Sequence, residues 1–157
     1  MPPITLKSTT GKWIMASAIL ASAMAFIDST ALNVVLPSLQ KDLKATGTDL
    51  FWLLNSYLLM LAALILPGGS LGDKLGRKKI FMIGIALFML GSTASGLAPT
   101  VGYLIVFRAL QGIGRALLLP DSLSIITASF DKSERGKAIG TWSAIPTMVT
   151  VGGPILG

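Results

Sequence analysis

The fold is decided by one stretch of the sequence, GSLGDKLGRKK at residues 69–79, which lies directly between two long apolar runs. It holds four of the thirteen basic residues, one acidic residue and three glycines. The apolar runs on either side are hydrophobic enough to lie in lipid. We therefore interpret this stretch, called the hinge below, as a tight basic loop at a membrane surface, with Gly76 allowing the turn.

The overall composition supports a membrane protein. Of the 157 residues, 52% are hydrophobic and 13% are charged, which is about half the charged share of a soluble domain. The net charge of +6 does not indicate a nucleic-acid partner, because the basic residues lie between the apolar runs rather than on one face. The chain has neither Cys nor His, so the sequence predicts no metal site and no enzyme, and proton chemistry must rest on carboxylates.

Apolar runs close to twenty residues long predict an all-α, polytopic membrane helix bundle. The expected spans are residues 13–36, 51–69, 80–97 and 103–127, with a fifth beginning at 138–157. The first span is expected to end near Pro37. The chain, residues 1–157, is interpreted as one partial domain.

The positive charges predict the orientation of these spans. Nine Lys and Arg residues lie in the segment before the first span and in the loops after the second and fourth spans. Only Lys41 and Lys44 lie in the two remaining loops. The positive-inside rule therefore predicts a multi-pass protein of the cytoplasmic (inner) membrane, partnered by the lipid bilayer, with its N-terminus in the cytoplasm.

Asp28 is the most informative single residue for function. A carboxylate within a span costs roughly 2.5–3.5 kcal/mol on an insertion scale, so a chain keeps one mainly for function or because it is paired. Arg108 lies at a matching depth, about 12–13 Å from the outer end of its span at about 1.5 Å per residue. Such a pair would take up or release a proton when a conformational change alters its separation. The simpler alternative, a carboxylate that only faces an aqueous cavity, remains open.

Several other polar residues near this pair have two interpretations. Thr30 and Asn33 lie within five residues of Asp28, and interhelical hydrogen bonds explain them as well as a contact with a substrate does. Gln111 lies one turn from Arg108. Positioning the arginine and touching a substrate are equally consistent with its place.

Polar and small residues of the later spans are interpreted in the same way. Asp121 is expected near the cytoplasmic surface, where an ion pair with Arg77 and simple solvation are the two alternatives. Close helix packing is the interpretation for three pairs with small-xxx-small spacing, which are Gly112 with Ala116, Gly91 with Ser95, and Gly153 with Gly157.

Four motifs occur in an order that resembles the major facilitator superfamily. The hinge resembles the signature loop between its second and third helices, G-x-L-x-D-[RK]-x-G-R-[KR]. Residues 28–37, DSTALNVVLP, are similar to the first-helix pattern of the fourteen-helix drug:proton antiporter branch. Residues 108–114, RALQGIG, and 153–157, GPILG, look like the fourth-helix R-x-x-Q-G-x-G motif and the fifth-helix antiporter motif. The chain is thus similar to the first four to five helices of such a transporter's N-terminal domain.

The resemblance implies multidrug efflux by antiport, in which protons drive the export of amphipathic, often cationic small molecules. The proton motive force would take the place of a cofactor. By the family pattern, Asp28 and Arg108 would serve proton coupling. Supporting roles are assigned to Thr30, Asn33, Gln111, Gly112 and Asp121. The resemblance further implies a conformational motif at Gly69, Asp73, Gly76, Arg77 and Lys78, and a leak-preventing antiporter motif at Gly153, Pro154 and Gly157.

The sequence also departs from the family pattern. Val149 stands where the fifth-helix motif has a glycine, and Arg115 stands where a small residue is usual, with Asp121 as a weak candidate for its compensating charge. The family has twelve or fourteen helices, so this sequence is expected to be a fragment or a truncated product. Two alternatives therefore stay open: a different exporter of the superfamily, for sugars, siderophores or metabolites, and a membrane remnant that does not transport.

Overall fold

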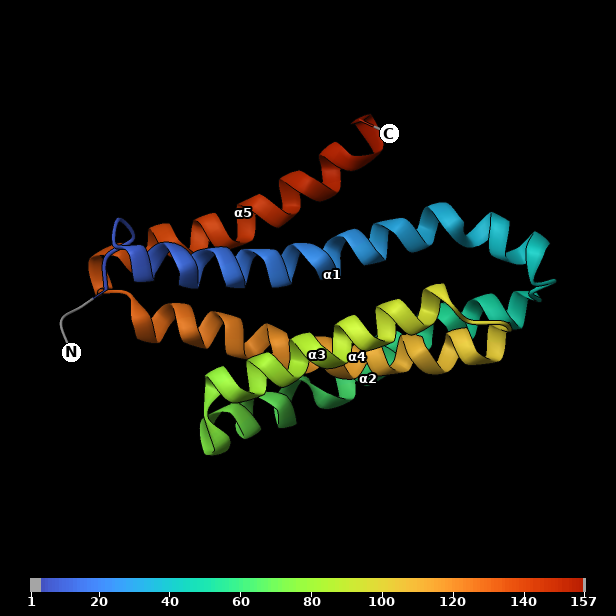
Figure 1. Cartoon of the computed structure of the whole chain (residues 1–157), viewed down its shortest axis with the longest axis horizontal. Coiled ribbons are helices and arrows are strands. Elements are labelled where there is room, and N and C mark those ends of the chain that lie inside the picture. Colours follow the sequence, from blue (N-terminus) through green and yellow to red (C-terminus); the bar gives the residue numbers. More distant parts are fainter. Residues whose placement is uncertain (1–3, 157) are drawn as a thin grey trace.

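The protein is an all-α bundle, as the apolar runs predicted. The computed structural model describes residues 4–156, with the side chains of residues 4–148 and 151. The helices of this part are α1 (Thr9–Asp42), α2 (Gly47–Leu75), α3 (Arg77–Gly96), α4 (Val101–Ser129) and α5 (Lys132–Leu156). Consecutive helices run in opposite directions along the long axis of the molecule (Figure 1).

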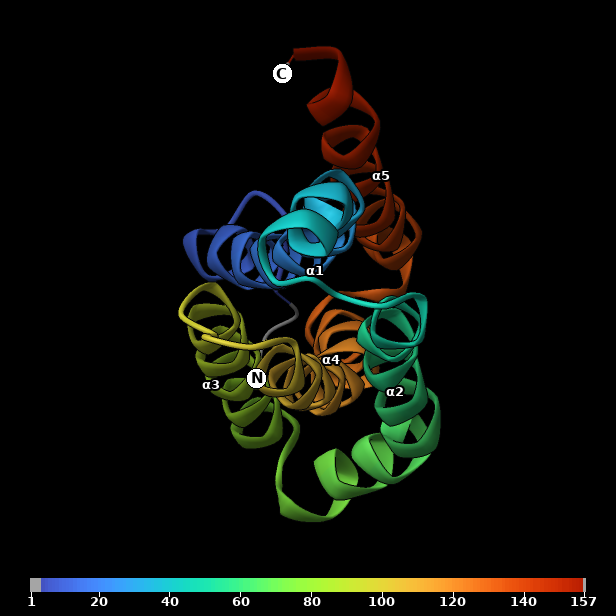
Figure 2. The same ribbon diagram turned by 90° about the vertical axis from the view of Figure 1, so that its right-hand side faces the viewer.

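Helix α4 is the centre of the bundle, because it contacts each of the other four helices. The view along the bundle shows α4 between α1, α2 and α3 (Figure 2). α1 also packs against α5, whose far end diverges from the other helices (Figure 1). Helices α1, α2 and α3 therefore surround α4 (Figure 2), and α5 packs mainly against α1.

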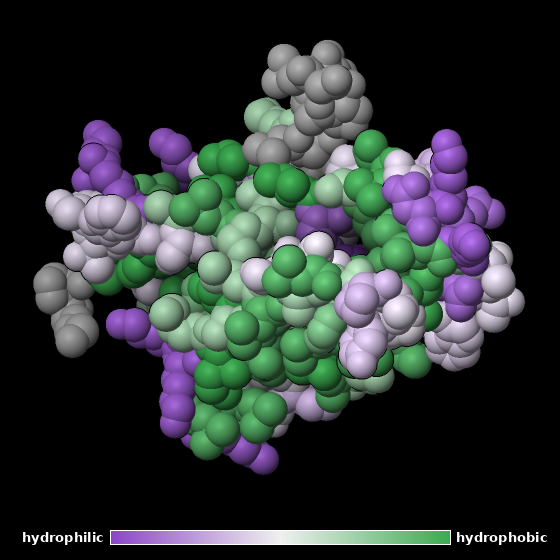
Figure 3. Space-filling view, turned by 45° about the vertical axis from the view of Figure 1, so that its right-hand side comes forward, coloured by the Kyte–Doolittle hydropathy of each residue, from purple (hydrophilic) through white to green (hydrophobic). Residues whose placement is uncertain are grey.

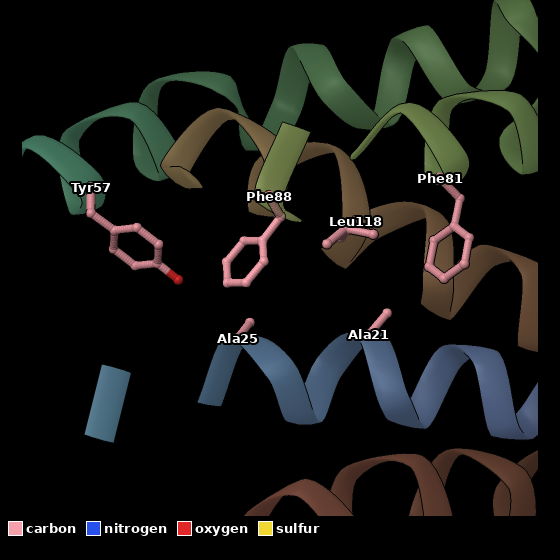
Figure 4. Close-up of a cluster of buried hydrophobic side chains, with 6 residues drawn as sticks. All are labelled: Ala21, Ala25, Tyr57, Phe81, Phe88 and Leu118. Atoms are coloured by element: carbon pink, nitrogen blue, oxygen red, sulfur yellow. The ribbon is translucent and has the colours of Figure 1, made fainter. Parts of the chain in front are cut away.

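The main apolar core lies where α1 meets α2, α3 and α4. Its buried members are Ala21, Ala25, Tyr57, Phe81, Phe88 and Leu118. The alanines of α1 face the larger side chains of the other helices (Figure 4). The small alanine side chains thus let α1 approach the other helices closely, and the aromatic rings fill the space between the helices.

The outer surface of the bundle is apolar. Trp13 is 73% exposed and Leu66 is 82% exposed, an arrangement that a protein in water avoids. On the face shown in Figure 3, hydrophobic residues cover most of the middle of the molecule and hydrophilic residues gather mainly toward its two ends. Helices α1 to α4 are each long and apolar enough to cross a membrane. The molecule is therefore built as a multi-pass membrane protein.

The non-helical connection within the hinge is shorter than the sequence predicted. α2 continues as helix to Leu75 and α3 begins at Arg77, so Gly76 alone separates the two helices. Gly76 has a φ of 100°, a conformation that L side chains rarely adopt. The polar residues before it fit a helix, because Lys74 lies at the negative C-terminal end of α2. The whole change of direction is therefore concentrated in one glycine.

Helix α1 also ends later than the sequence predicted. It continues through Pro37 to Asp42, and the amide of Leu43 still donates to the carbonyl oxygen of Leu39 at 3.0 Å. A proline lacks one N–H and disturbs one turn of a helix, but the hydrogen bonds beyond it can form. The proline therefore lies within α1 and does not end it.

Candidate functional site: a buried ion pair between α1 and α4

Asp28 of α1 and Arg108 of α4 form an ion pair within the bundle. The Nη1 atom of Arg108 donates to Oδ2 of Asp28 and, at 3.0 Å, to Oε1 of Gln111. Nε2 of Gln111 donates to the other carboxylate oxygen, Oδ1 of Asp28, at 2.8 Å. The side chains of Arg108 and Asp28 are 5% and 18% exposed. Both oxygens of a largely buried carboxylate are thus held by two residues of one helix.

Three neighbouring residues fix the position of this network. The ring of Tyr57, from α2, lies 4.5 Å from the guanidinium carbon of Arg108, within cation–π range. Gly112 packs against the backbone of Tyr57, since a Cβ on it would overlap the Tyr57 carbonyl oxygen. A Cβ on Gly91 of α3 would lie 2.7 Å from Cγ of Gln111. The two glycines therefore let α2 and α3 approach α4 at the level of the network.

A cavity of about 490 Å³ connects the network to one end of the bundle. Asp28 and Arg108 line its inner part, and Asp42 and Leu43, where α1 ends, line its outer part. Ser95 also lines it, and its buried Oγ has no hydrogen-bond partner among the described residues. The carboxylate is therefore reached from the end of the molecule that carries the α1–α2 turn.

The hinge contains a second, more exposed ion pair. Nε and Nη2 of Arg77 donate to Oδ1 of Asp73 at 3.1 and 3.0 Å, and Nη1 donates to the carbonyl oxygen of Ser124 in α4 at 3.3 Å. The sequence raised an ion pair between Arg77 and Asp121, and within the described residues it does not form. Asp121 lies instead against Gly72, where any Cβ would overlap its carboxylate. Arg77 is held by Asp73 because the two stand four residues apart across the turn.

The remaining hinge residues have separate surroundings. Gly69 lies beside the ring of Pro120, since a Cβ on it would lie 3.4 Å from Cβ of the proline. Lys78 is exposed. Asp121 of α4, which packs against Gly72 of the hinge, is 1% exposed. Its Oδ2 has no hydrogen-bond partner in the part of the chain that the structure describes.

Some predicted residues are not part of the Asp28 network. The hydroxyl of Thr30 donates to the carbonyl oxygen of Phe26 at 3.1 Å, and the amide of Asn33 donates to that of Ser29 at 3.2 Å. Both side chains thus bond to their own helix. The side-chain predictions for Gly153, Pro154 and Gly157 lie outside the described residues.

Tyr57 is the residue that sequence reasoning missed. Its ring lies beside Arg108, and its hydroxyl accepts a hydrogen bond from Nη1 of Arg115 at 2.7 Å. The same Nη1 donates to the carbonyl oxygen of Ala25 at 3.1 Å, whereas no ion pair joins Arg115 to Asp121 among the described residues. Arg115 therefore has neutral polar partners in place of the acidic one that the sequence suggested. A phenol in the middle of an apolar run was the signal that could have identified Tyr57.

Comparisons with known proteins agree with the four motifs. The sequence profile of the Major Facilitator Superfamily matches residues 18–157. The chain is 39% identical over 134 residues to the tetracenomycin C resistance and export protein of Streptomyces glaucescens, covering 85% of this chain and 25% of that protein. It is 39% identical over 132 residues to the methyl viologen resistance protein SmvA of Salmonella typhimurium, covering 83% and 27%. The chain thus spans about a quarter of the length of these relatives.

A solved structure has the same arrangement of helices. It is the crystal structure of a bacterial homolog to the human lysosomal transporter Spinster, in an inward-facing and occupied conformation. The TM-score is 0.78 at 26% identity, over 87% of this chain and 30% of that one. The order of motifs, the helical bundle and the profile match lead to one assignment: the chain belongs to the Major Facilitator Superfamily, a family of membrane transporters and not of enzymes.

Proposed function

We propose that the chain forms the first helices of a proton-coupled antiporter that exports amphipathic small molecules, of the fourteen-helix drug:proton type. The proposal draws on relatives named for resistance to, or export of, tetracenomycin C and methyl viologen. We place the protein in the cytoplasmic membrane with its N-terminus in the cytoplasm. The excess of nine basic residues against two in the loops supports that orientation.

The observation that carries the proposal is that two side chains, those of Arg108 and Gln111, each bind one oxygen of the Asp28 carboxylate. Arg108 and Gln111 both belong to α4, whereas Asp28 belongs to α1. A movement of α1 relative to α4 therefore breaks both contacts together. It leaves a carboxylate in apolar surroundings without its cation, a state that protonation relieves. Proton uptake and the change of shape are coupled through this step.

The cavity beside the network provides the route for the proton. It extends from Asp28 to Asp42 and Leu43 at the end of α1, which lies on the outer side of the membrane in the orientation that we propose. A proton from the outer side enters here and reaches Asp28 when α1 moves away from α4. Thr30 and Asn33 lie two and five residues beyond Asp28 on α1, and their side chains bond to that helix's own backbone, so we assign them to its packing rather than to the proton route.

The hinge acts as a conformational latch in this proposal. Arg77 joins the end of α2, through Asp73, to α4, through the carbonyl oxygen of Ser124. Gly76 allows α3 to turn back at once, and the exposed Lys78 faces the anionic inner leaflet. Movement of α4 relative to the α2–α3 turn must break the Arg77 bonds, so the hinge holds one conformation until another contact replaces them.

The proposal is tested by dye transport in inside-out membrane vesicles that contain the full-length gene product. An imposed proton gradient is expected to drive rhodamine 6G, an amphipathic cation, into wild-type vesicles. Asp28→Asn keeps the size of the side chain and its hydrogen bond from Gln111 but removes the protonatable group, so gradient-driven uptake is expected to disappear. The matched control is Asp131→Asn, an exposed carboxylate before α5, which should transport as the wild type does. Proton-driven uptake by Asp28→Asn would refute the coupling role.

A further inference from the structure

Arg115 is a cation at the centre of α4 that has no acidic partner among the described residues. It lies midway between Val101 and Ser129, the ends of that helix. The ion pairs of the described residues join Asp73 to Arg77 and Asp28 to Arg108. An ionisable residue at the middle of a membrane span marks a functional site more often than a structural one, because the charge is costly there.

The contacts of Arg115 leave part of its guanidinium available. Among the described residues its hydrogen bonds go to Ala25 and Tyr57, and both use Nη1. Its Nε is buried and has no hydrogen-bond partner in the described part of the chain. The rings of Phe26 and Tyr57 lie 5.1 and 5.9 Å from its guanidinium carbon. Aromatic faces and neutral acceptors stabilise the cation but do not neutralise it.

A cavity of about 250 Å³ lies beside this arginine, between α1, α4 and α5. Most of its wall is apolar, from residues such as Ala21, Phe26 and Leu118. Trp142 of α5 also lines it, and the buried Nε1–H of this indole has no acceptor among the described residues. A cavity of about 150 Å³ accepts a benzene ring, so this one has room for an aromatic ring with a polar substituent.

We propose that this cavity binds the carboxylate or phenolate end of an aromatic compound, with Arg115 as the residue that selects for the negative charge. The inference rests on the proposed export function and adds one named class, aromatic acids, to the amphipathic compounds that the protein exports. The apolar wall and the ring of Phe26 receive the aromatic part. Arg115 and the indole of Trp142 offer N–H donors and, in the described residues, the cavity wall includes no carboxylate that would compete for them.

The cavity is separate from the Asp28 network, although Tyr57 touches both arginines. The network's own cavity is lined by other residues of α1 and by residues of α3, whereas the Arg115 cavity is lined by residues of α5. A proton site and an anion site on the same face of α4 can thus be occupied at the same time. An aromatic anion next to Arg115 also supplies the negative charge that the described residues do not.

The test measures equilibrium binding of two xanthene dyes to the purified full-length protein without a proton gradient. Fluorescein carries a carboxylate and a phenolate, and rhodamine 123 is a cation of similar shape. Arg115→Gln keeps a hydrogen-bonding side chain without the charge. It is expected to weaken fluorescein binding at least about tenfold, the loss of one charge-assisted hydrogen bond, and to leave rhodamine 123 binding unchanged or tighter. The matched control Lys137→Gln removes an exposed charge from α5 and should change neither affinity.

Two further variants keep the test decisive if Arg115→Gln does not fold. Arg115→Lys retains the charge and should retain the preference for fluorescein, and Trp142→Phe retains the ring and should weaken fluorescein binding about threefold. Equal fluorescein affinities in the wild type and in Arg115→Gln, or in Trp142→Phe if that variant alone folds, would overturn the inference. So would equal losses for both dyes. If rhodamine is transported with the proton gradient but fluorescein binding does not depend on Arg115, this inference alone is refuted. If fluorescein binding depends on Arg115 but no dye is transported with the proton gradient, the proposed function alone is refuted.

Discussion

The two sides of α4 are packed in different ways. Toward α2 and α3 the helix presents glycines, and a Cβ on Gly114 would lie 2.6 Å from the backbone nitrogen of Phe88. Toward α1 and α5 it presents Arg108 and Arg115, and cavities of about 490 and 250 Å³ adjoin them. One side brings backbones together, and the other holds polar side chains next to empty space.

This difference separates a rigid part of the bundle from a part that can rearrange. Backbone contacts through glycine leave no side chain to adjust, so the packing of α4 against α2 and α3 resists change at the level of those glycines. The α1 side is joined to α4 by an ion pair and by hydrogen bonds from Gln111 and Arg115. The polar groups that the proposed mechanism requires to change partners therefore lie on the side with the cavities. Four substitutions test this comparison, in decreasing order of expected effect.

The largest effect is expected from breaking the ion pair on the α1 side. Arg108→Leu leaves Asp28 largely buried without its cation, which should lower the free energy of unfolding by about 3–5 kcal/mol. The double variant with Asp28→Leu should recover much of that loss, because neither charge then remains buried. Thermal and denaturant unfolding of the purified protein in detergent measures both. Equal stabilities of Arg108→Leu and of the exposed control Lys137→Leu would show that the pair does not join α1 to α4.

The next effect is expected on the tight side. Gly114→Ala places a methyl group against the backbone of Phe88 and should cost about 1–3 kcal/mol of unfolding free energy. The matched control is Gly140→Ala on α5, where a Cβ would meet nothing within 4 Å, and where better helix propensity should stabilise the protein slightly. Similar melting temperatures of the two variants would remove the contrast between the two sides.

A smaller effect is expected at Tyr57, which joins the tight side to the loose one. Tyr57→Phe keeps the ring beside Arg108 but removes the hydroxyl that accepts from Arg115, at a cost of about 1.5 kcal/mol. Tyr103→Phe, at an exposed position near the start of α4, is the control and should be neutral. The difference in unfolding free energy between the two variants measures how strongly Arg115 depends on α2. If both are neutral, the two sides of α4 are not linked through this phenol.

The smallest effect on stability is expected at the hinge. Asp73 and Arg77 are 63% and 39% exposed at their side chains, and exposed pairs contribute between about 0 and 1 kcal/mol. Asp73→Asn should therefore unfold within about 1 kcal/mol of the wild type, while slowing transport if the pair is a latch. Lys74→Gln, one residue along the same turn, is the control for loss of a charge. A loss of stability as large as that of Arg108→Leu would place the hinge among the rigid contacts.

Some features of the site could be predicted from the sequence and others could not. Asp28 and Arg108 were identifiable because a charge within an apolar run is rare and costly. Helical rise then matched their depths, but depth does not tell which way a side chain faces. For that reason neither alternative for Asp121 describes the structure: Arg77 is held by Asp73 instead, and the Asp121 side chain is buried rather than solvated.

The boundaries of the helices were likewise only partly predictable from the sequence. Hydropathy located the apolar runs, but it did not distinguish a polar loop from a polar helix end. The hinge therefore seemed longer than the single residue Gly76, and α1 seemed to end at Pro37. Hydrogen bonding of the backbone decides where a helix ends, and it depends on the local dihedral angles rather than on polarity.

The sequence by itself determined the all-α membrane architecture, the family and the two charges most in need of partners. These follow from local properties, which are the length of the apolar runs, the order of the motifs and the cost of burying a charge. The tertiary structure alone decided that Gln111 holds the second oxygen of Asp28, that Tyr57 touches both arginines and that Arg115 borders a cavity. Those contacts depend on the rotation and spacing of whole helices, which the glycine contacts of α4 set and which no single segment encodes.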